Sequence, residues 1–129
     1  MRVLLIDDHA LFRIGLRELL ERRDIDVIDA VGDCEEGIRK ARELNPDVVL
    51  LDMRMPEMDG MEVLRQLRRE GPSPEVILIT GDPSVDSAVE AMRLGAYDYV
   101  TKPVDAQRIQ HLVEQAAKRS RLERENRLL

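Results

Sequence analysis

Apolar runs that alternate with helical patterns are the feature that most constrains this fold. Runs rich in valine, isoleucine and leucine predict buried strands, near residues 2–7, 25–31, 47–52, 75–80 and 97–101. A helical pattern follows each run, near residues 9–22, 34–44, 59–70, 84–94 and 105–128. Strands that alternate with helices form right-handed βαβ units. We therefore expect an α/β fold, with a doubly wound parallel sheet that helices cover on both faces.

Apolar faces and turn residues support this prediction. The first predicted helix carries its apolar residues on one face, at Leu11, Ile14, Leu16, Leu19 and Leu20. The third helix has a similar face, at Met61, Leu64 and Leu67. Turn residues end the second, third and fourth helices, at Asn45-Pro46, Gly71-Pro72 and Gly95.

Length and composition fit a single domain with an aliphatic core. The chain has 129 residues, of which 43% are hydrophobic and only three are aromatic, and this suffices for one core. No apolar run approaches the roughly 20 residues that span a bilayer, and the N-terminus has no signal-peptide pattern. The one cysteine, Cys34, excludes an internal disulfide and suits a reducing compartment. We expect a cytoplasmic protein without membrane contact, with Cys34 in the first turn of a helix that Asp33 caps.

The charge is acidic and uneven. The net charge of −6 at pH 7 argues against nucleic-acid binding by the globule. Residues 105–129 carry six basic and four acidic residues, a balance of +2, whereas the first 104 residues carry −8. The sequence therefore predicts an acidic globule with a mixed tail.

Polar side chains stand where the predicted strands end. Asp7-Asp8, Asp52, Thr80 and Lys102 each lie at the end of an apolar run. Ligands of an open α/β sheet bind outside the carboxyl ends of its strands. We therefore expect three carboxylates, a hydroxyl and an ammonium group to meet at one edge of the sheet.

The three carboxylates predict a metal site. Asp7, Asp8 and Asp52 would repel one another unless a cation lies among them, and Mg²⁺ fits an all-oxygen set best. The alternative is that Asp7 or Asp8 caps the first helix, and one of them could do both. His9 adjoins the pair, but a hard cation prefers oxygen, so we expect His9 to be an exposed first-turn residue.

Asp52 opens a segment with the features of a reactive loop. A strand-end carboxylate beside Mg²⁺ can attack phosphorus and form an aspartyl phosphate. Pro56 and Gly60 fit a sharp loop that leaves this carboxylate exposed. Ordinary turn chemistry is the alternative, but it does not explain the neighbouring carboxylates.

Lys102 and Thr80 complete the expected site. The ammonium group of Lys102 and the hydroxyl of Thr80 can both bind a phosphoryl oxygen, although each residue alone would be read as a solvated surface residue. Pro103 follows Lys102, and such a bond at a tight strand exit can be cis.

Together these residues resemble the receiver domain of bacterial two-component response regulators, over about residues 2–118. The family pattern is an acid pair, a phosphoacceptor Asp with Pro and Gly four and eight residues later, Thr or Ser, and Lys-Pro. Here it reads Asp7-Asp8, Asp52, Pro56, Gly60, Thr80 and Lys102-Pro103. The resemblance implies a flavodoxin-like (βα)5 fold with strand order 2-1-3-4-5, a receiver domain in residues 1–118 and an extended C-terminal helix.

The resemblance also implies a function. A sensor histidine kinase would donate a phosphoryl group to Asp52, with Mg²⁺ held by Asp8, Asp52 and the backbone carbonyl of Arg54, and with Asp7 helping to position the ion. Such a protein is a signalling switch rather than an enzyme.

Two residues would carry the switch. Thr80 and Tyr99 match the family's switch pair, whose movement would alter the surface of the fourth helix and fifth strand. The expected output is control of transcription; the alternative is a stand-alone chemotaxis-type receiver that binds a partner protein. Residues 7–16 resemble NarL-type regulators. Residues 88–103 resemble both NtrC-type and FixJ-type regulators, and residues 122–129 resemble NtrC-type regulators.

The tail, residues 119–129, predicts a helical linker or the start of a coiled coil toward an output domain. Residues 105–129 contain no Gly or Pro and could form about seven helical turns. Four apolar residues can pack on the sheet, at Ile109, Leu112, Val113 and Ala116. Three later residues have the spacing of a coiled-coil seam and predict a homodimer, at Leu122, Asn126 and Leu129. A solvated helix end is the alternative.

Arg54 bears on two further hypotheses. A haloacid-dehalogenase-type phosphatase needs an aspartate two residues after its nucleophile, and Arg54 cannot serve as that acid. No Gly-rich nucleotide-binding loop is present either. Arg54 and Asp82 could pair across the mouth of the site and hinder the water that hydrolyses an aspartyl phosphate; two independently solvated side chains are the alternative.

Overall fold

The computed structural model describes residues 1–53, 60–69, 74–81 and 85–128. The strands are β1 (Arg2–Ile6), β2 (Asp26–Val31), β3 (Val48–Asp52), β4 (Glu75–Thr80) and β5 (Asp98–Thr101). The helices are α1 (Ala10–Glu21), α2 (Cys34–Leu44), α3 (Gly60–Arg69), α4 (Val85–Arg93) and α5 (Ala106–Leu128). Each element lies within a few residues of its predicted position.

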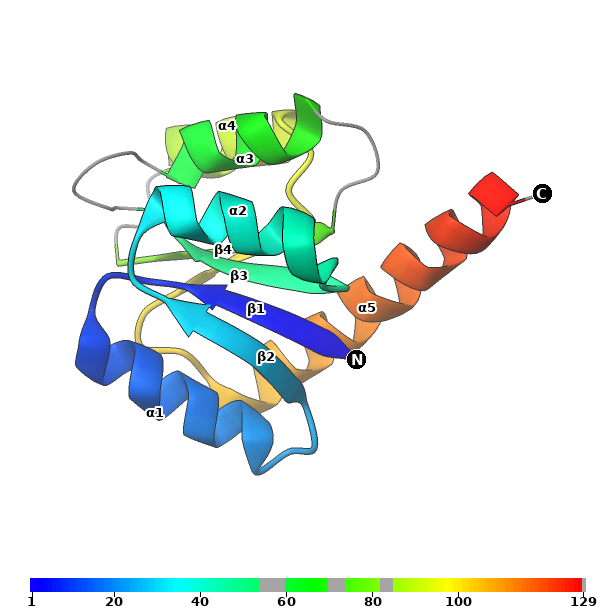
Figure 1. Ribbon diagram of the computed structural model, residues 1–129. Helices are drawn as coiled ribbons and strands as arrows, with labels where there is room; N and C mark the ends of the chain where they lie inside the picture. The colour runs from blue at the N-terminus through cyan, green and yellow to red at the C-terminus, as the bar shows by residue number, and fades with distance from the viewer. Residues whose placement is uncertain (54–59, 70–73, 82–84, 129) are drawn as a thin grey trace.

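The strands form one parallel sheet in the order β2-β1-β3-β4-β5. Helices α2, α3 and α4 lie on one face of this sheet, and α1 and α5 lie on the other (Figure 1). The flavodoxin-like α/β fold and its strand order are therefore confirmed.

Two cores flank the sheet because successive side chains of a strand point to opposite faces. In β1, Val3 and Leu5 pack in the core under α1 and α5, whereas Leu4 and Ile6 pack in the core under α2, α3 and α4. All residues of β3 and β4 are buried. Burial on both faces explains why these strands are continuous apolar runs rather than alternating ones.

The predicted apolar face of α1 is partly wrong. Leu16 and Leu20 are buried, but Leu11 and Ile14 are 88% and 56% exposed. The inward stripe instead contains Phe12, which packs against the core one turn before Leu16. The exposed pair Leu11 and Ile14 and the inward pair Phe12 and Leu16 both have helical spacing. The apolar pattern was therefore compatible with two rotations of the helix about its axis, and packing on the sheet selected one of them.

Helix α2 begins as the sequence predicts. Asp33 is the N-cap residue, and its side chain accepts a hydrogen bond from the backbone N–H of Glu36 at 3.1 Å. Cys34 is the first residue of the helix and is buried. Among the described residues, no helix combines the length and hydropathy of a membrane-spanning segment.

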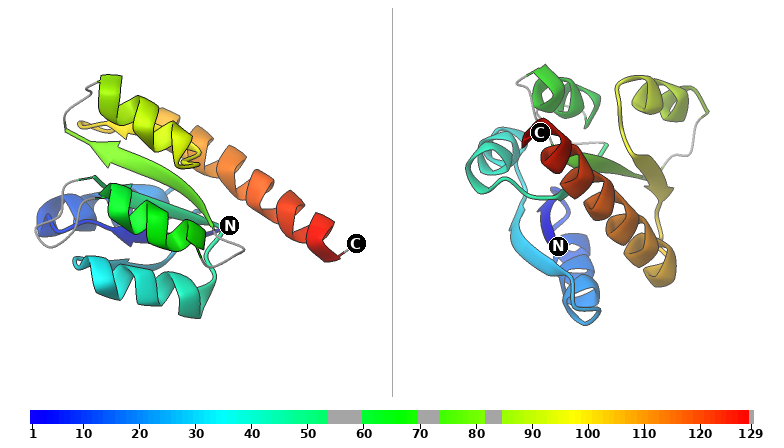
Figure 2. Two further views of the ribbon diagram at one scale, coloured as in Figure 1. Left: turned by 90° about the horizontal axis from the view of Figure 1, so that it is seen from above. Right: turned by 90° about the vertical axis from the view of Figure 1, so that its right-hand side faces the viewer.

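Helix α5 starts on the sheet and ends beyond it. The four apolar residues that were predicted to face the sheet are all buried, at Ile109, Leu112, Val113 and Ala116. The C-terminal half of α5 passes the N-terminal end of β1 and then projects from the molecule (Figure 2).

The helix remains attached to the globule past residue 118. Arg119 lies 3.6 Å from the carboxylate of Glu75, which is 3% exposed, and Ser120 is buried. Arg124 lies 3.2 Å from Asp47, and it donates a hydrogen bond to the carbonyl of Pro46.

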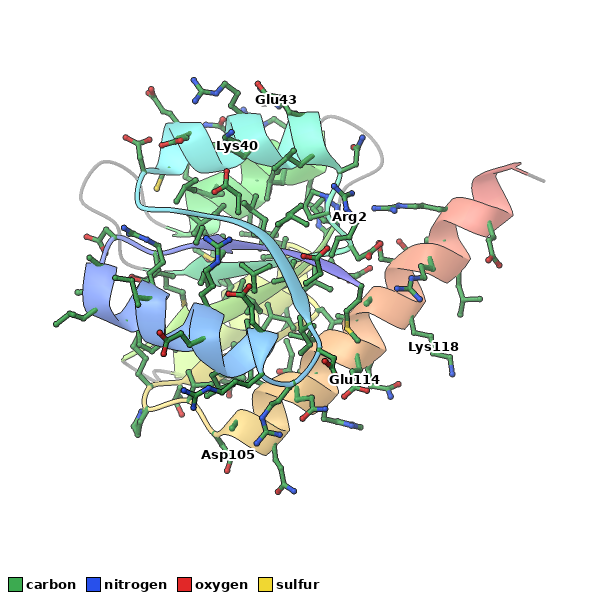
Figure 3. All side chains as sticks on the ribbon, turned by 60° about the horizontal axis from the view of Figure 1, so that its bottom comes forward. Arg2, Lys40, Glu43, Asp105, Glu114 and Lys118 are labelled. Atoms are coloured by element: carbon green, nitrogen blue, oxygen red, sulfur yellow. The ribbon has the colours of Figure 1, made fainter. Side chains whose placement is uncertain are left out.

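Ion pairs with the amino end of the sheet therefore fix the direction of α5. Figure 3 shows Arg2 at this same end, where its backbone N–H donates to Asp47 at 2.8 Å. Burial raises the pKa of Glu75, and the Arg119 guanidinium opposes this shift.

Candidate functional site

Four strand ends build the site at the carboxyl edge of the sheet. Asp7 directly follows β1, Asp52 ends β3, Thr80 ends β4, and Lys102 directly follows β5. Backbone hydrogen bonds between neighbouring strands fix these ends. Asp7 N–H donates to the carbonyl of Val31, Met53 N–H to that of Ile79, and Lys102 N–H to that of Thr80, at 3.0, 3.0 and 2.8 Å.

The acidic residues lie together. The carboxylates of Asp7, Asp8 and Asp52 and the ring of His9 each offer one ligand atom, and these atoms lie within 4.8 Å of one another. Asp7 and Asp52 are buried, whereas the side chain of Asp8 is one-quarter exposed. Burial strengthens the repulsion among the carboxylates.

The helix-capping alternative does not account for this cluster. His9 is the N-cap residue of α1, and its side chain makes no capping hydrogen bond. The Asp7 carboxylate accepts the backbone N–H of His9 itself, at 2.8 Å. Asp7 therefore orders the turn that precedes the helix and still presents its second oxygen, Oδ2, to the site.

Lys102 lies against the acidic cluster. Its Nζ is 3.4 Å from Asp7 Oδ2 and 3.8 Å from Asp52 Oδ2. The same ammonium group lies 4.2 Å from the centroid of the Phe12 ring, a cation–π distance. The Lys102–Pro103 peptide bond is cis.

Thr80 and Tyr99 occupy neighbouring strands on the β5 side of the site. Thr80 pairs with Thr101 in the β4–β5 register and is 5% exposed. Tyr99 is half-buried and packs against the core under α2, α3 and α4.

Gly60 lies where a side chain would collide with the backbone of the site. A Cβ atom at this position would lie 2.8 Å from Met53 Cα and 3.0 Å from the carbonyl oxygen of Asp52. The N–H of Gly60 donates to the carbonyl of Met53 at 2.7 Å. The start of α3 therefore packs directly on the backbone that carries Asp52.

Three predicted site residues, Arg54, Pro56 and Asp82, lie outside the described residues. The metal-binding carbonyl of Arg54, the loop role of Pro56 and the Arg54–Asp82 pair therefore stay predictions.

Sequence reasoning missed two residues that support the site. Phe12 supplies the ring beside Lys102, and only its place in the inward stripe of α1 could have revealed it. Arg13 donates a hydrogen bond to the backbone carbonyl of Asp7 at 2.6 Å. Its guanidinium passes over Gly32, where a Cβ would lie 2.6 Å from Arg13 Nη1. No local motif signals this contact between α1 and the end of β2.

The prediction for His9 was right about exposure but incomplete. Its side chain is 63% exposed, yet its Nδ1 lies 3.2 Å from Asp8, 3.3 Å from Asp7 and 3.5 Å from Asp52. The ring turns toward the carboxylates because the residue precedes α1 directly, at the turn that Asp7 orders.

The residues present fit a divalent cation. Asp8 Oδ1 is buried and has no hydrogen-bond partner among the described residues, where it lies 3.2 Å from His9 Nδ1, and Asp7 Oδ2 has only the ion pair with Lys102 there. Buried carboxylate oxygens without hydrogen-bond donors are costly. A hard cation with oxygen ligands removes that cost.

Comparison with known proteins identifies the family. The model of the response regulator receiver domain matches residues 3–114. The chain belongs to this family. Receiver domains are signalling domains that bind Mg²⁺ in an acidic pocket and interact with histidine kinases and with output domains or partner proteins.

Relatives of this receiver domain include both regulators of transcription and chemotaxis proteins. It is 41% identical over 119 residues to the transcriptional regulatory protein LiaR of Bacillus subtilis, covering 92% of this chain and 56% of LiaR. It is 34% identical to the chemotaxis protein CheY of Listeria monocytogenes, covering 92% of this chain and 99% of CheY. The chain thus spans about half the length of LiaR, and it spans 25–30% of several other relatives.

A solved structure agrees with the fold. The response regulator receiver domain protein of Clostridium thermocellum has a TM-score of 0.87 and 36% sequence identity, covering 94% of this chain and 97% of the other.

Proposed function

We propose that this receiver domain accepts a phosphoryl group on Asp52 from the phosphohistidine of a sensor histidine kinase. The observation that carries the proposal is the position of Asp52. Its buried carboxylate ends the central strand β3, lies 3.8 Å from the Lys102 ammonium group, and shares a cluster with two other aspartates. This arrangement combines a nucleophile, a cation for the phosphoryl group and a set of metal ligands.

In the proposed reaction, a carboxylate oxygen of Asp52 forms a bond to phosphorus. The bond between phosphorus and the histidine nitrogen of the kinase breaks, and its electron pair stays on the imidazole. Lys102 balances negative charge on the phosphoryl oxygens, and the Thr80 hydroxyl donates a hydrogen bond to one of them.

The metal would be held by the carboxylates of Asp8 and Asp52 and the backbone carbonyl of Arg54, with Asp7 helping to position it. When bound, Mg²⁺ supplies positive charge that neutralises the phosphoryl oxygens and orients them.

Thr80 and Tyr99 are proposed to transmit the phosphorylation of Asp52 to the protein surface. Movement of the Thr80 hydroxyl toward the phosphoryl group would let the Tyr99 ring rotate inward. The surface of α4 and β5 would change as a result.

Phosphorylation by a small molecule tests the proposal. With acetyl phosphate and Mg²⁺, intact-mass spectrometry should detect one added phosphate, and Asp52→Asn should abolish it. Asp26→Asn is the matched control, because Asp26 is exposed at the far end of the sheet. Labelling that survives in Asp52→Asn would refute the assignment.

The proposed output is control of transcription in the cytoplasm, through an output domain. The likeness to LiaR, of which the chain spans 56%, supports it. The net charge of −6 supports the proposal that this domain itself does not bind nucleic acid.

A stand-alone chemotaxis-type receiver that acts by binding a partner protein is the second candidate. The 99% coverage of CheY favours it. The full-length gene distinguishes the two, because an output domain encoded after residue 129 would exclude the stand-alone form.

We further propose that residues 119–129 link the receiver domain at 1–118 to that output and form a homodimer seam. Leu122 is 52% exposed and points to no core of the described structure. Leu122→Gln should convert a dimer to a monomer in sedimentation velocity, whereas Lys118→Gln, a polar change on the same helix, should not. A wild-type monomer, with or without acetyl phosphate, would contradict the seam.

A further inference from the structure

The imidazole of His9 adds a nitrogen atom to the carboxylate cluster. Its Nδ1 lies 3.2–3.5 Å from one oxygen of each of Asp7, Asp8 and Asp52. The other histidine of the chain, His111, is exposed on α5 and belongs to no such cluster among the described residues.

These separations are close to those of atoms that share one metal ion. With ligand bonds of about 2.0–2.2 Å, neighbouring ligand atoms lie roughly 3.0 Å apart in octahedral geometry and roughly 3.4 Å apart in tetrahedral geometry. The separations of Nδ1 from the three carboxylates lie near the tetrahedral value. The four ligand atoms spread over as much as 4.8 Å, so side-chain rotations, without a change in the backbone, would draw them around one ion.

The backbone of His9 is fixed on both sides. Its N–H donates to Asp7 Oδ1 at 2.8 Å, and its carbonyl accepts the N–H of Arg13 at 2.9 Å. The ring therefore extends from a backbone turn that is held in place at the start of α1.

The chemistry of the donor set then favours a particular class of ion. Mg²⁺ prefers oxygen ligands and binds an imidazole poorly, whereas Mn²⁺, Co²⁺ and Zn²⁺ accept mixed nitrogen and oxygen ligands with increasing affinity. A site of three carboxylates alone would lack this added preference.

We propose that His9 Nδ1 is a further metal ligand of this site and gives it a preference for transition-metal dications over Mg²⁺. The proposal rests on the proposed function, since it concerns the same site, and it adds that the preferred ion differs from Mg²⁺. It predicts that the metal occupancy of the phosphoacceptor pocket depends on the concentration of Mn²⁺ or Zn²⁺.

Metal titration of the full chain tests the preference. Isothermal titration calorimetry gives the dissociation constants of Zn²⁺ and Mg²⁺ for the wild type, His9→Ala and His111→Ala. Loss of a residue that only supports a metal ligand costs about 10–100-fold in affinity. Loss of the ligand itself in His9→Ala should therefore weaken Zn²⁺ binding at least about tenfold more than it weakens Mg²⁺ binding. His111→Ala should leave the ratio of the two constants unchanged.

A spectroscopic measurement on the wild type avoids dependence on a variant. Pulsed electron paramagnetic resonance of bound Mn²⁺ should detect coupling to one nitrogen, and ¹⁵N labelling of histidine should change that coupling. An unchanged Zn²⁺-to-Mg²⁺ ratio in His9→Ala, an equal effect in His111→Ala, or the absence of nitrogen coupling would each overturn the proposal.

These outcomes are distinct from failure of the proposed function. If acetyl phosphate and Mg²⁺ phosphorylate Asp52 but no nitrogen coupling is found, the His9 ring only donates a hydrogen bond to the carboxylates. The metal-ligand role of His9 is then refuted, and the proposed function is not. If Asp52 is not phosphorylated, the proposed function falls, and the calorimetric ratio still decides whether His9 is a ligand.

Discussion

Replacement of Gly60 by alanine should destabilise the protein through one contact with the backbone of the site. The new Cβ would lie 2.8 Å from Met53 Cα and 3.0 Å from the Asp52 carbonyl oxygen. Both neighbours are backbone atoms between the end of β3 and the start of α3. Neither can move aside by rotating a side chain, so the strand end or the helix must shift.

The expected magnitude follows from two opposing effects. Overpacking of this kind costs about 1–3 kcal/mol. Alanine in place of glycine in a helix recovers about 0.5–1 kcal/mol, and less at the first helical residue. With a gain of about 0.5 kcal/mol, the net loss in the free energy of unfolding should be about 0.5–2.5 kcal/mol.

Urea denaturation followed by circular dichroism measures this loss, and Gly15→Ala is the matched control. Gly15 lies within α1, and a Cβ there would meet nothing within 4 Å. Gly15→Ala should therefore raise the free energy of unfolding by about 0.5–1 kcal/mol. Equal stabilisation by both substitutions would refute the argument from close approach at Gly60. Because Gly60→Ala shifts the backbone of Asp52, it should also slow phosphorylation by acetyl phosphate, whereas Gly15→Ala should not.

Three further predictions concern the metal, the amino end of the sheet and α1. Mg²⁺ at 100 times its dissociation constant should raise the free energy of unfolding by about 2.7 kcal/mol. In thermal melts, EDTA or the Asp8→Ala substitution should remove this gain. An undiminished gain in Asp8→Ala would exclude Asp8 as a ligand. Burial raises the pKa of Glu75 in the folded protein. The protonated Glu75 side chain therefore contributes its full stabilisation below the ordinary pKa of about 4.3. This stabilisation is lost as the pH rises through the raised pKa of the folded state. Glu75→Gln should therefore gain stability relative to the wild type with rising pH across that window, and a difference independent of pH in urea titrations would contradict the shift. Finally, Leu11→Gln should change stability by less than about 0.5 kcal/mol, whereas Leu16→Ala should cost about 2–5 kcal/mol; similar losses for both would restore the predicted apolar face of α1.

The elements of the fold were predictable because their signals are local. Strands β3 and β4 are buried on both faces, so successive residues inside them are apolar, and the run is visible in the sequence. The end of each run marks the carboxyl edge of a parallel sheet. For this reason the approach of Lys102 to Asp7 and Asp52 could be predicted without coordinates.

The orientation of individual side chains was less predictable. The apolar residues of α1 fit two helical phases, and only contact with the sheet buries Phe12 and Leu16 while it exposes Leu11. The ring of His9 could face solvent or the acidic cluster from the same position in the sequence. Its direction depends on the turn that Asp7 holds through one hydrogen bond.

The sequence by itself determined the βα alternation, the covering of both faces of the sheet by helices and the meeting of the charged strand ends, because periodicity and run length reflect burial directly. Tertiary structure alone decided how α5 leaves the globule. Arg124 lies 77 residues from Asp47 in the chain, yet the two side chains form an ion pair at the amino end of the sheet. Such a pairing depends on where the strands begin and on the angle at which α5 crosses them, and no local pattern of residues encodes either.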